Sequence, residues 1–222
     1  MNQYLTASFI LIVSFIILAS LVSPRINANV NKTSLHDADY SAFILINNSH
    51  YRPFDGLMIL LTQYGREVVW TLASILLLIF GGSKGRNTVV IIAMTMIVLI
   101  IIGQIAKEAV GRPRPIMYDN SSSLVAPDKE FAFPSGHALL VSSGAAVMLA
   151  LFRDSHKRQI ISIGLTIEAA LVCFSRVYVG GHYPLDVIGG ILLGVGVAFI
   201  FVALVKPISY QILEPISKAL KR

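Results

Sequence analysis

The sequence predicts an all-α integral membrane protein, a bundle of six transmembrane helices with an interfacial helical segment between the first and the second. Three observations support this. The 222-residue chain is 55% hydrophobic and only 14% charged, whereas a soluble domain carries about 25% charged residues. Apolar runs that approach the length needed to cross about 30 Å of hydrocarbon recur along it. Lys and Arg gather in short clusters between those runs, as they do in the loops of membrane proteins.

Six runs are candidates for membrane-spanning helices, because backbone groups in lipid must be paired within their own segment. They are Leu5–Val22, about Glu67–Phe80, Thr88–Ala106, Ala138–Phe152, Ile160–Phe174 and Leu185–Val205. The second, fourth and fifth are short and need a turn from their flanks. A cleaved signal peptide is the alternative for the first run, but its N-terminal residues MNQY lack the positive charge of such peptides.

The segment between the first two runs, Ser23–Arg66, holds polar residues and then the amphipathic stretch FILINNSHYRPFDGLMILLTQYG. We expect one or two helices lying at the membrane surface here. The alternative is that part of the stretch enters the bilayer. The whole chain, 1–222, is expected to form a single domain. Its net charge of +6 comes without a long basic run, so we expect no nucleic-acid partner.

The distribution of charge predicts that both termini are cytoplasmic. With the N-terminus inside, the short inner loops hold basic residues at 84, 86, 153, 157 and 158, and four more follow residue 205. The outer loops are longer and carry most of the acidic residues. Asn31, Asn47 and Asn120 each begin an N-x-Ser/Thr triplet on the outer side. Chance explains these triplets as well as glycosylation does.

Eight polar residues stand at the ends of predicted spans. They are Lys107 and Arg114 after the third, Ser135 and His137 at the start of the fourth, Ser175 and Arg176 at the end of the fifth, and His182 and Asp186 at the start of the sixth. The end of an odd-numbered span and the start of the next share a membrane face. All eight are therefore expected at one rim, the outer one, where they form a candidate active site.

The residue types at this rim predict phosphate chemistry. Three cations call for an anion with several oxygens, and the PSG turn at 134–136 adds the start of a helix, which also favours anions. His182 and Asp186 are four residues apart and share a helical face. The carboxylate would hold Nδ1–H and leave Nε2 to act as nucleophile, with His137 as general acid. The set predicts phosphoryl transfer through a phosphohistidine, with no metal and no cofactor required.

Three segments resemble the signature motifs of the type-2 phosphatidic acid phosphatase superfamily. They are KEAVGRPRP at Lys107–Pro115, PSGH at Pro134–His137 and SRVYVGGHYPLD at Ser175–Asp186, and every fixed position is filled at the correct spacing. The resemblance implies that His182 is the nucleophile, that Asp186 orients it and that His137 is the general acid. It also implies phosphate binding by Lys107, Arg114 and Arg176, assisted by Ser135, Gly136 and Ser175.

The same resemblance implies a metal-independent phosphatase that acts on a lipid phosphate or diphosphate at the cell membrane. A polyprenyl diphosphate of the undecaprenyl or dolichyl type is the favoured substrate, because the chain is compact with short loops, as in carrier-lipid recyclers of this family. The alternatives are phosphatidic acid or phosphatidylglycerophosphate, transfer to another lipid or sugar, and a non-enzymatic binder or transporter. A soluble haloperoxidase with similar motifs does not fit six apolar runs. The oligomeric state is left open.

Three residues outside the strict motifs also raise expectations. Glu168 lies inside the fifth span, where a carboxylate is a functional hypothesis by default. A pair with a motif arginine and a protonated structural role are both open for it. Trp70 is expected to anchor at the membrane interface. Arg112 is expected to contact either a lipid headgroup or the phosphate.

Overall fold

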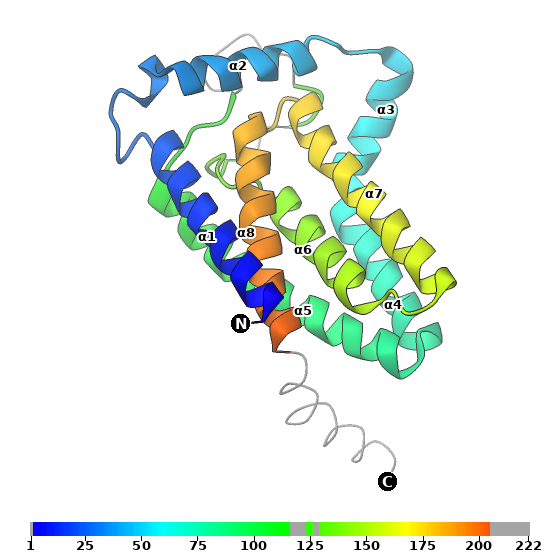
Figure 1. Ribbon diagram of the computed structural model, residues 1–222. Helices are drawn as coiled ribbons and strands as arrows, with labels where there is room; N and C mark the ends of the chain where they lie inside the picture. The colour runs from blue at the N-terminus through cyan, green and yellow to red at the C-terminus, as the bar shows by residue number, and fades with distance from the viewer. Residues whose placement is uncertain (1, 116–122, 127–128, 205–222) are drawn as a thin grey trace.

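The computed structural model describes residues 2–115, 123–126 and 129–204, and within these ranges the chain is helical without strands (Figure 1). Its elements are α1 Gln3–Val22, the 3-10 helix η1 Val30–Lys32, α2 Ser34–Asn47, α3 Arg52–Leu60, the π-helical η2 Leu61–Val69, α4 Trp70–Phe80, α5 Gly82–Val110, α6 Gly136–Leu151, α7 His156–Tyr178 and α8 Pro184–Ala203. The all-α prediction is confirmed. Asn120, Val205 and the basic residues of the tail lie outside the described residues.

Five helical stretches in the described part of the chain are long and apolar enough to cross a membrane. They are Gln3–Val22, Arg52–Phe80, Gly82–Val110, His156–Tyr178 and Pro184–Ala203, and the 16-residue α6 is a shorter apolar helix. Large apolar side chains point outward from them, such as Phe9 on α1 (70% exposed) and Ile105 on α5 (63% exposed). Apolar surface this extensive is unfavourable in water and suits contact with lipid.

The second of these stretches begins earlier than its apolar pattern predicts. The pattern starts at about Glu67, but α3, η2 and α4 follow one another without a break from Arg52 to Phe80. The charges of Arg66 and Glu67, whose side chains pair with each other, interrupt the hydropathy pattern without interrupting the helix. The amphipathic stretch of the sequence is thus divided between the separate helix α2 and this long helix.

The short helix α6 lies at the centre of the bundle, with α5, α7 and α8 packed around it (Figure 1). Its residues from Val141 to Met148 are all buried. Most of them are Ser, Gly or Ala, and small side chains let neighbouring helices approach closely. The ring of Trp70 fills the space beside Gly144, where a Cβ would have no room.

Trp70 therefore lies in the core, which corrects the expectation of an interfacial anchor. It is only 4% exposed. Its Nε1 donates to Glu168 Oε2 at 3.0 Å. An indole can be buried in this way because its one polar atom has found a partner. The pair with a motif arginine that was open for Glu168 does not occur among the described residues.

Helix α2 lies across one end of the bundle, over the ends of α7 and α8 (Figure 1). Hydrogen bonds to the ends of α7 and α8 attach it there. Asn47 Nδ2 donates to the Tyr178 carbonyl at the end of α7 at 3.0 Å. The backbone N–H of Leu185, at the start of α8, donates to Asp39 Oδ1 at 2.9 Å. Asn47 is fully buried, which leaves no room for a glycan at the second N-x-Ser/Thr triplet.

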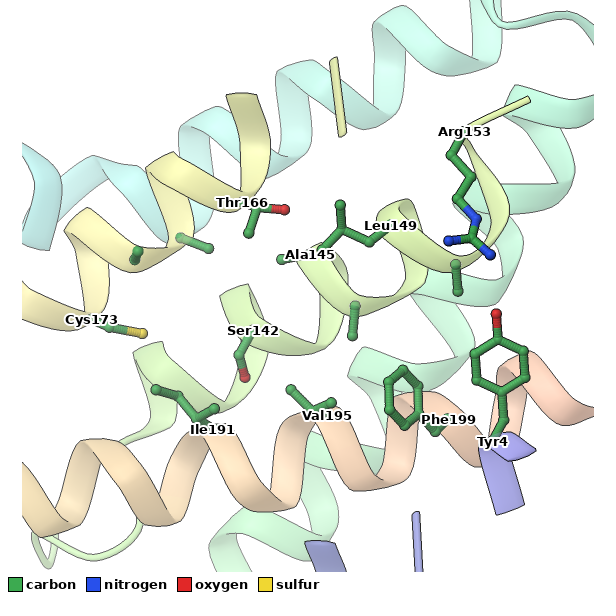
Figure 2. Close-up of a pocket in the computed structure, with 14 residues that line it drawn as sticks. Tyr4, Ser142, Ala145, Leu149, Arg153, Thr166, Cys173, Ile191, Val195 and Phe199 are labelled. Atoms are coloured by element: carbon green, nitrogen blue, oxygen red, sulfur yellow. The ribbon is translucent and has the colours of Figure 1, made fainter. Parts of the chain in front are cut away.

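A cavity of about 420 Å³ opens between α6, α7 and α8 (Figure 2). Its walls are largely apolar, with Ala145, Ile191 and Val195 among the residues that line them. It runs along α6 from Ser142 to Ala150 and reaches Arg153 just beyond the end of that helix, away from its start. Apolar walls cannot replace the hydration of a phosphate, so this cavity does not suit the reacting group.

Candidate active site

The ends of α5, α6 and α8 are joined at the end of the bundle that α2 covers. Helix α5 stops at Gly111, whose φ of 66° is the left-handed conformation that glycine adopts readily. After Gly111 the chain changes direction and continues with the second half of the first motif, residues 112–115. Ser135 N, at the start of α6, donates to the Asp186 carbonyl in the first turn of α8 at 2.9 Å. The three motifs are thereby brought to one place.

His182 is buried between Arg114 and Asp186. Its Nε2 lies 3.1 Å from Arg114 Nη1, and its Nδ1 lies 3.6 Å from Asp186 Oδ2. A guanidinium can only donate, so Nε2 presents its lone pair to Arg114, and the proton of a neutral ring is on Nδ1, facing the carboxylate. The 3.6 Å separation exceeds the range of a hydrogen bond. The ring nevertheless has the tautomer in which Nε2 can act as a nucleophile.

Asp186 is held in place by two donors besides its approach to His182. Arg112 Nη1 donates to Oδ1 at 2.7 Å, and the backbone N–H of Tyr183 donates to Oδ2 at 2.9 Å. The carboxylate also lies in the first turn of α8, where a negative charge interacts favourably with the helix dipole. Asp186 therefore has little freedom to turn away from the imidazole.

Arg112 binds two carboxylates, which corrects the expectation of a headgroup or phosphate contact. Its Nη2 donates to Asp39 Oδ2 at 2.6 Å, while its Nη1 holds Asp186. The guanidinium also lies over the ring of Tyr183, 4.4 Å from the centroid, a cation–π contact. Asp39 comes from α2, and nothing in its sequence context, HDAD, indicated that it would be buried beside the third motif.

In this cluster, burial and the neighbouring charges shift the pKa values of the side chains in opposite directions. Burial would lower the pKa of the Arg112 guanidinium, but the neighbouring Asp186 and Asp39 outweigh it and the pKa is raised. Burial raises the pKa of the Asp39 carboxyl, and Arg112 offsets part of that increase. Burial likewise raises the pKa of Tyr183 to about 12. Arg112 thus stays charged, and its charge is what makes two buried carboxylates tolerable beside each other.

The three predicted phosphate-binding cations are each positioned by a protein oxygen. The Lys107 ammonium pairs with the Glu130 carboxylate. Arg114 donates from Nε to the Glu130 carbonyl at 2.8 Å and from Nη1 to the Gly181 carbonyl at 2.9 Å. Arg176 Nη1 donates to Thr62 Oγ1 on η2 at 2.6 Å. The Glu130 side chain is 55% exposed, so it reaches Lys107 from the solvent side.

The two predicted serines differ in what their hydroxyls do. Ser135 caps α6, and its carbonyl accepts from Leu139 N at 2.9 Å. Its buried Oγ has no hydrogen-bond partner among the described residues, so it can meet a substrate oxygen. Ser175 Oγ donates to the Val172 carbonyl at 2.7 Å, one turn back in α7. The Ser175 hydroxyl is thus already used by its own helix.

Two cavities, of about 390 and 280 Å³, contain most of the predicted residues. The larger is lined by Lys107, Arg114, Gly136, His137 and His182, together with Arg66, Lys129 and Glu130. The smaller is lined by Arg114, His137 and Arg176, together with Thr62, Gln63, Arg66, Glu67, Val125, Ala126 and Gly181. Asp186 lies behind His182. The prediction from sequence did not include Arg66, because a charged residue next to an apolar run is typical of the ordinary end of a membrane span.

Comparison with known proteins agrees with this geometry. Residues 88–209, more than half of the chain, match the model of the PAP2 superfamily. The chain is 39% identical to an undecaprenyl-diphosphatase of Sulfolobus acidocaldarius, over 72% of this chain and 75% of that protein. It is 27% identical to undecaprenyl-diphosphatase BcrC of Bacillus subtilis, over 73% and 82%.

A solved structure shares the fold. The crystal structure of a transmembrane PAP2-type phosphatidylglycerolphosphate phosphatase from Bacillus subtilis superposes with a TM-score of 0.66, over 92% of this chain and 96% of that one. At 24% identity this likeness concerns the fold alone. With its motifs, its apolar helices and the matched segment, the chain is an integral membrane protein that belongs to the PAP2 superfamily.

Proposed function

We propose that this protein is a phosphatase that hydrolyses a polyprenyl diphosphate, of the undecaprenyl or dolichyl type, to the lipid monophosphate and inorganic phosphate. Membership of a phosphatase family and similarity to undecaprenyl-diphosphatases support the activity. The observation that carries the mechanism is the placement of His182. His182 lines a cavity that Lys107 and Arg114 also line, its Nε2 lies 3.1 Å from Arg114 Nη1, and its Nδ1 faces the buried Asp186.

In the first step the terminal phosphoryl group binds to Lys107, Arg114 and Arg176. Nε2 of His182 attacks the phosphorus, and the N–P bond forms as the bond to the bridging oxygen breaks. Asp186 stabilises the positive charge that develops on the imidazole. The bridging oxygen leaves with the lipid monophosphate and takes a proton from His137.

The second step uses water and restores the enzyme. His137, now neutral, takes a proton from a water molecule whose oxygen attacks the phosphorus. The N–P bond breaks and inorganic phosphate leaves. One positioned acid or base contributes about 10²–10⁴-fold, and one preorganised donor about 10²–10³-fold. Several donors around a covalent step are therefore needed, with Ser135 and Gly136 assisting from the start of α6 and Ser175 supporting Arg176 within α7.

The membrane arrangement that fits this function extends the fold. In it, α6 is the sixth membrane-spanning helix of a single domain, 1–222, and α2 lies at the membrane surface. Both termini are cytoplasmic and the active site opens on the extracytoplasmic face. The central place of α6 and the position of α2 across the active-site end support this arrangement, as does the cluster of basic residues in the short loops at the other end.

The test is phosphate release by the purified protein in detergent with EDTA present. The panel contains a polyprenyl diphosphate, phosphatidic acid and phosphatidylglycerophosphate. We expect the diphosphate to react fastest, and His182→Ala to lower the rate by at least about 10³-fold. His156→Ala, at an exposed histidine at the start of α7, is the matched control and should retain the wild-type rate.

Each alternative has its own outcome. Faster hydrolysis of phosphatidic acid or phosphatidylglycerophosphate would contradict the proposed substrate. A strict requirement for Mg²⁺ would contradict the mechanism. Little free phosphate without an added acceptor would identify a transferase. Undiminished phosphate release by His182→Ala would remove this site from the reaction.

A further inference from the structure

Arg66 reaches the active site from a part of the chain that carries none of the three motifs. It lies on η2, where the backbone follows a π-helical path over Leu61–Val69, and such widened turns occur frequently at functional sites. Gly65 lets η2 pack tightly on α7, because a Cβ there would lie 2.4 Å from Val172 Cγ2. The Arg66 guanidinium is thereby held beside the start of α6, with Nη1 3.5 Å from His137 Nδ1.

Arg66 stands where the two active-site cavities meet, since it lines both of them together with Arg114 and His137. His182 lines the larger cavity, so a phosphoryl group under attack by Nε2 lies there. The oxygen that leaves must lie next to the acid, His137. The rest of the leaving group, which is bonded to that oxygen, then extends past His137 to within reach of Arg66.

We propose that Arg66 binds the phosphate that leaves with the lipid, so that the site holds both phosphates of a diphosphate at once. This inference rests on the proposed hydrolysis of a polyprenyl diphosphate. The planar guanidinium offers two parallel donors, which match a pair of phosphate oxygens. In the structure these donors hold the Glu67 carboxylate. The Glu67 side chain is 49% exposed, so it can turn to water when a phosphate takes its place.

The chemistry of the leaving group makes Arg66 selective. When a diphosphate is cleaved, the bond between the terminal phosphorus and the bridging oxygen breaks, and negative charge builds up on the departing lipid monophosphate. The positive charge of the Arg66 guanidinium stabilises that negative charge. When a monophosphate ester is cleaved, the ester oxygen takes a proton from His137 as its bond to phosphorus breaks, and it leaves as an uncharged alcohol. No second phosphate is then present for Arg66 to bind.

The first test compares farnesyl diphosphate with farnesyl monophosphate as substrates. For Arg66→Gln we expect kcat/KM to fall by about 10²–10³-fold on the diphosphate, and by clearly less on the monophosphate, where only the contact of Arg66 with His137 is lost. The monophosphate rate also reports that the variant is folded. Arg52→Gln is the matched control, since Arg52 is an exposed arginine on the same continuous helix, and it should change neither rate. Equal losses on both substrates, or no loss, would overturn the inference.

The second test measures binding and does not depend on diphosphate turnover. Inorganic pyrophosphate should inhibit monophosphate hydrolysis by the wild type more strongly than inorganic phosphate does. Arg66→Gln should remove most of that difference, while Arg66→Lys, which keeps the charge but not the fork, should keep part of it. Failure of the wild type to cleave the diphosphate would refute the proposed function. If the wild type cleaves the diphosphate, and Arg66→Gln is still inhibited more strongly by pyrophosphate than by phosphate to the same extent as the wild type, only the role of Arg66 would be refuted.

Discussion

Arg112 shows how a residue inside a motif can serve another residue rather than the substrate. It lies between Lys107 and Arg114 in the sequence, yet its side chain turns away from the cavities and joins Asp39 to Asp186. Two buried carboxylates repel each other, and a charged guanidinium between them removes that repulsion. We therefore expect Asp39, on a helix far away in the sequence, to act as a positioning residue for His182.

We expect Asp39→Asn to lower kcat by about 10-fold with little change in KM, which corresponds to about 1.4 kcal/mol in the transition state. The amide keeps the shape of the side chain but loses the charge that balances Arg112. The loss of one charged hydrogen bond should also lower the free energy of unfolding by about 1–3 kcal/mol. Steady-state kinetics and thermal unfolding in detergent measure the two effects.

The matched control for this change is Asp37→Asn, at an exposed aspartate on the same helix. It should leave kcat and stability as they are. An unchanged kcat in Asp39→Asn, or a loss that appears in KM alone, would mean that α2 has no influence on the orientation of His182.

The motif residues could be placed from the sequence because their positions follow from counting spans. Lys107, Arg114, His137 and His182 each lie within a turn or two of a helix end, and adjacent helix ends share a face. Asp39, Arg66 and Glu130 could not be placed in this way. Their roles depend on how α2, η2 and the loop before α6 fold back over the site, which is decided by tertiary contacts and leaves no local pattern.

At the scale of single helices, the contact between α6 and α8 is what fixes the start of α6. Gly190 and Gly194 of α8 face α6 without a Cβ between them. At Gly190 the neighbour is the Ser135 carbonyl oxygen, which caps α6 two residues before His137. Packing within the membrane is thus connected directly to the position of the proposed acid.

Gly190→Ala tests this contact. The added Cβ would lie 2.6 Å from the Ser135 carbonyl oxygen, and backbone cannot give way as a flexible side chain can. We expect a loss of about 1–3 kcal/mol in the free energy of unfolding, as for other overpacked interiors, together with a lower kcat. Thermal unfolding and phosphate release in detergent measure both.

Gly164→Ala on α7 is the control for that change, because Gly164 has nothing within 4 Å of an added Cβ. Alanine is the better helix former by about 1 kcal/mol, so this variant should be as stable as the wild type or slightly more stable. Similar behaviour of the two alanine variants would show that the space between α6 and α8 is not tight.

The helices themselves were largely predictable, because length and hydropathy specify a membrane helix with little reference to its neighbours. The exceptions have physical reasons. The apolar pattern marks the start of the long helix too late, because the charges of Arg66 and Glu67 interrupt the hydropathy but not the helical backbone. Trp70 lies in the core and not at the interface, because Gly144 leaves space for its ring and Glu168 accepts a hydrogen bond from its Nε1–H. Pairing between distant residues cannot be read from an average over a window of sequence.

For the whole molecule, the two ends of the bundle have different chemistry. One end holds the motifs and α2. At the other, Asp154 accepts hydrogen bonds from Arg158 and pairs with Lys84, and these contacts lower the pKa of Asp154 to about 2. One carboxylate neutralises only one of its two cations, so this end keeps a net positive charge to which Arg86, Arg153 and Lys157 also contribute. By the positive-inside rule we expect this end to face the cytoplasm.

A labelling experiment checks this orientation. In a Cys173→Ser background, which removes the one native thiol, single cysteines are introduced by Asn29→Cys before α2 and by Lys157→Cys in α7, both at exposed positions. An impermeant thiol reagent added to intact cells should label the first and not the second. Permeabilised cells should show both. The reverse result would move the active site to the cytoplasmic face.

The reach of η2 into the active site has a consequence for how substrates can change during evolution. The matched family segment begins at residue 88 and contains every group that makes or breaks a bond in the proposed mechanism. Arg66, which would select a diphosphate, lies before it. Substitutions before residue 88 could therefore change the substrate preference while the reaction chemistry stays intact. Motifs alone would then identify the phosphatase chemistry, and part of the choice of substrate would depend on Arg66, which precedes them.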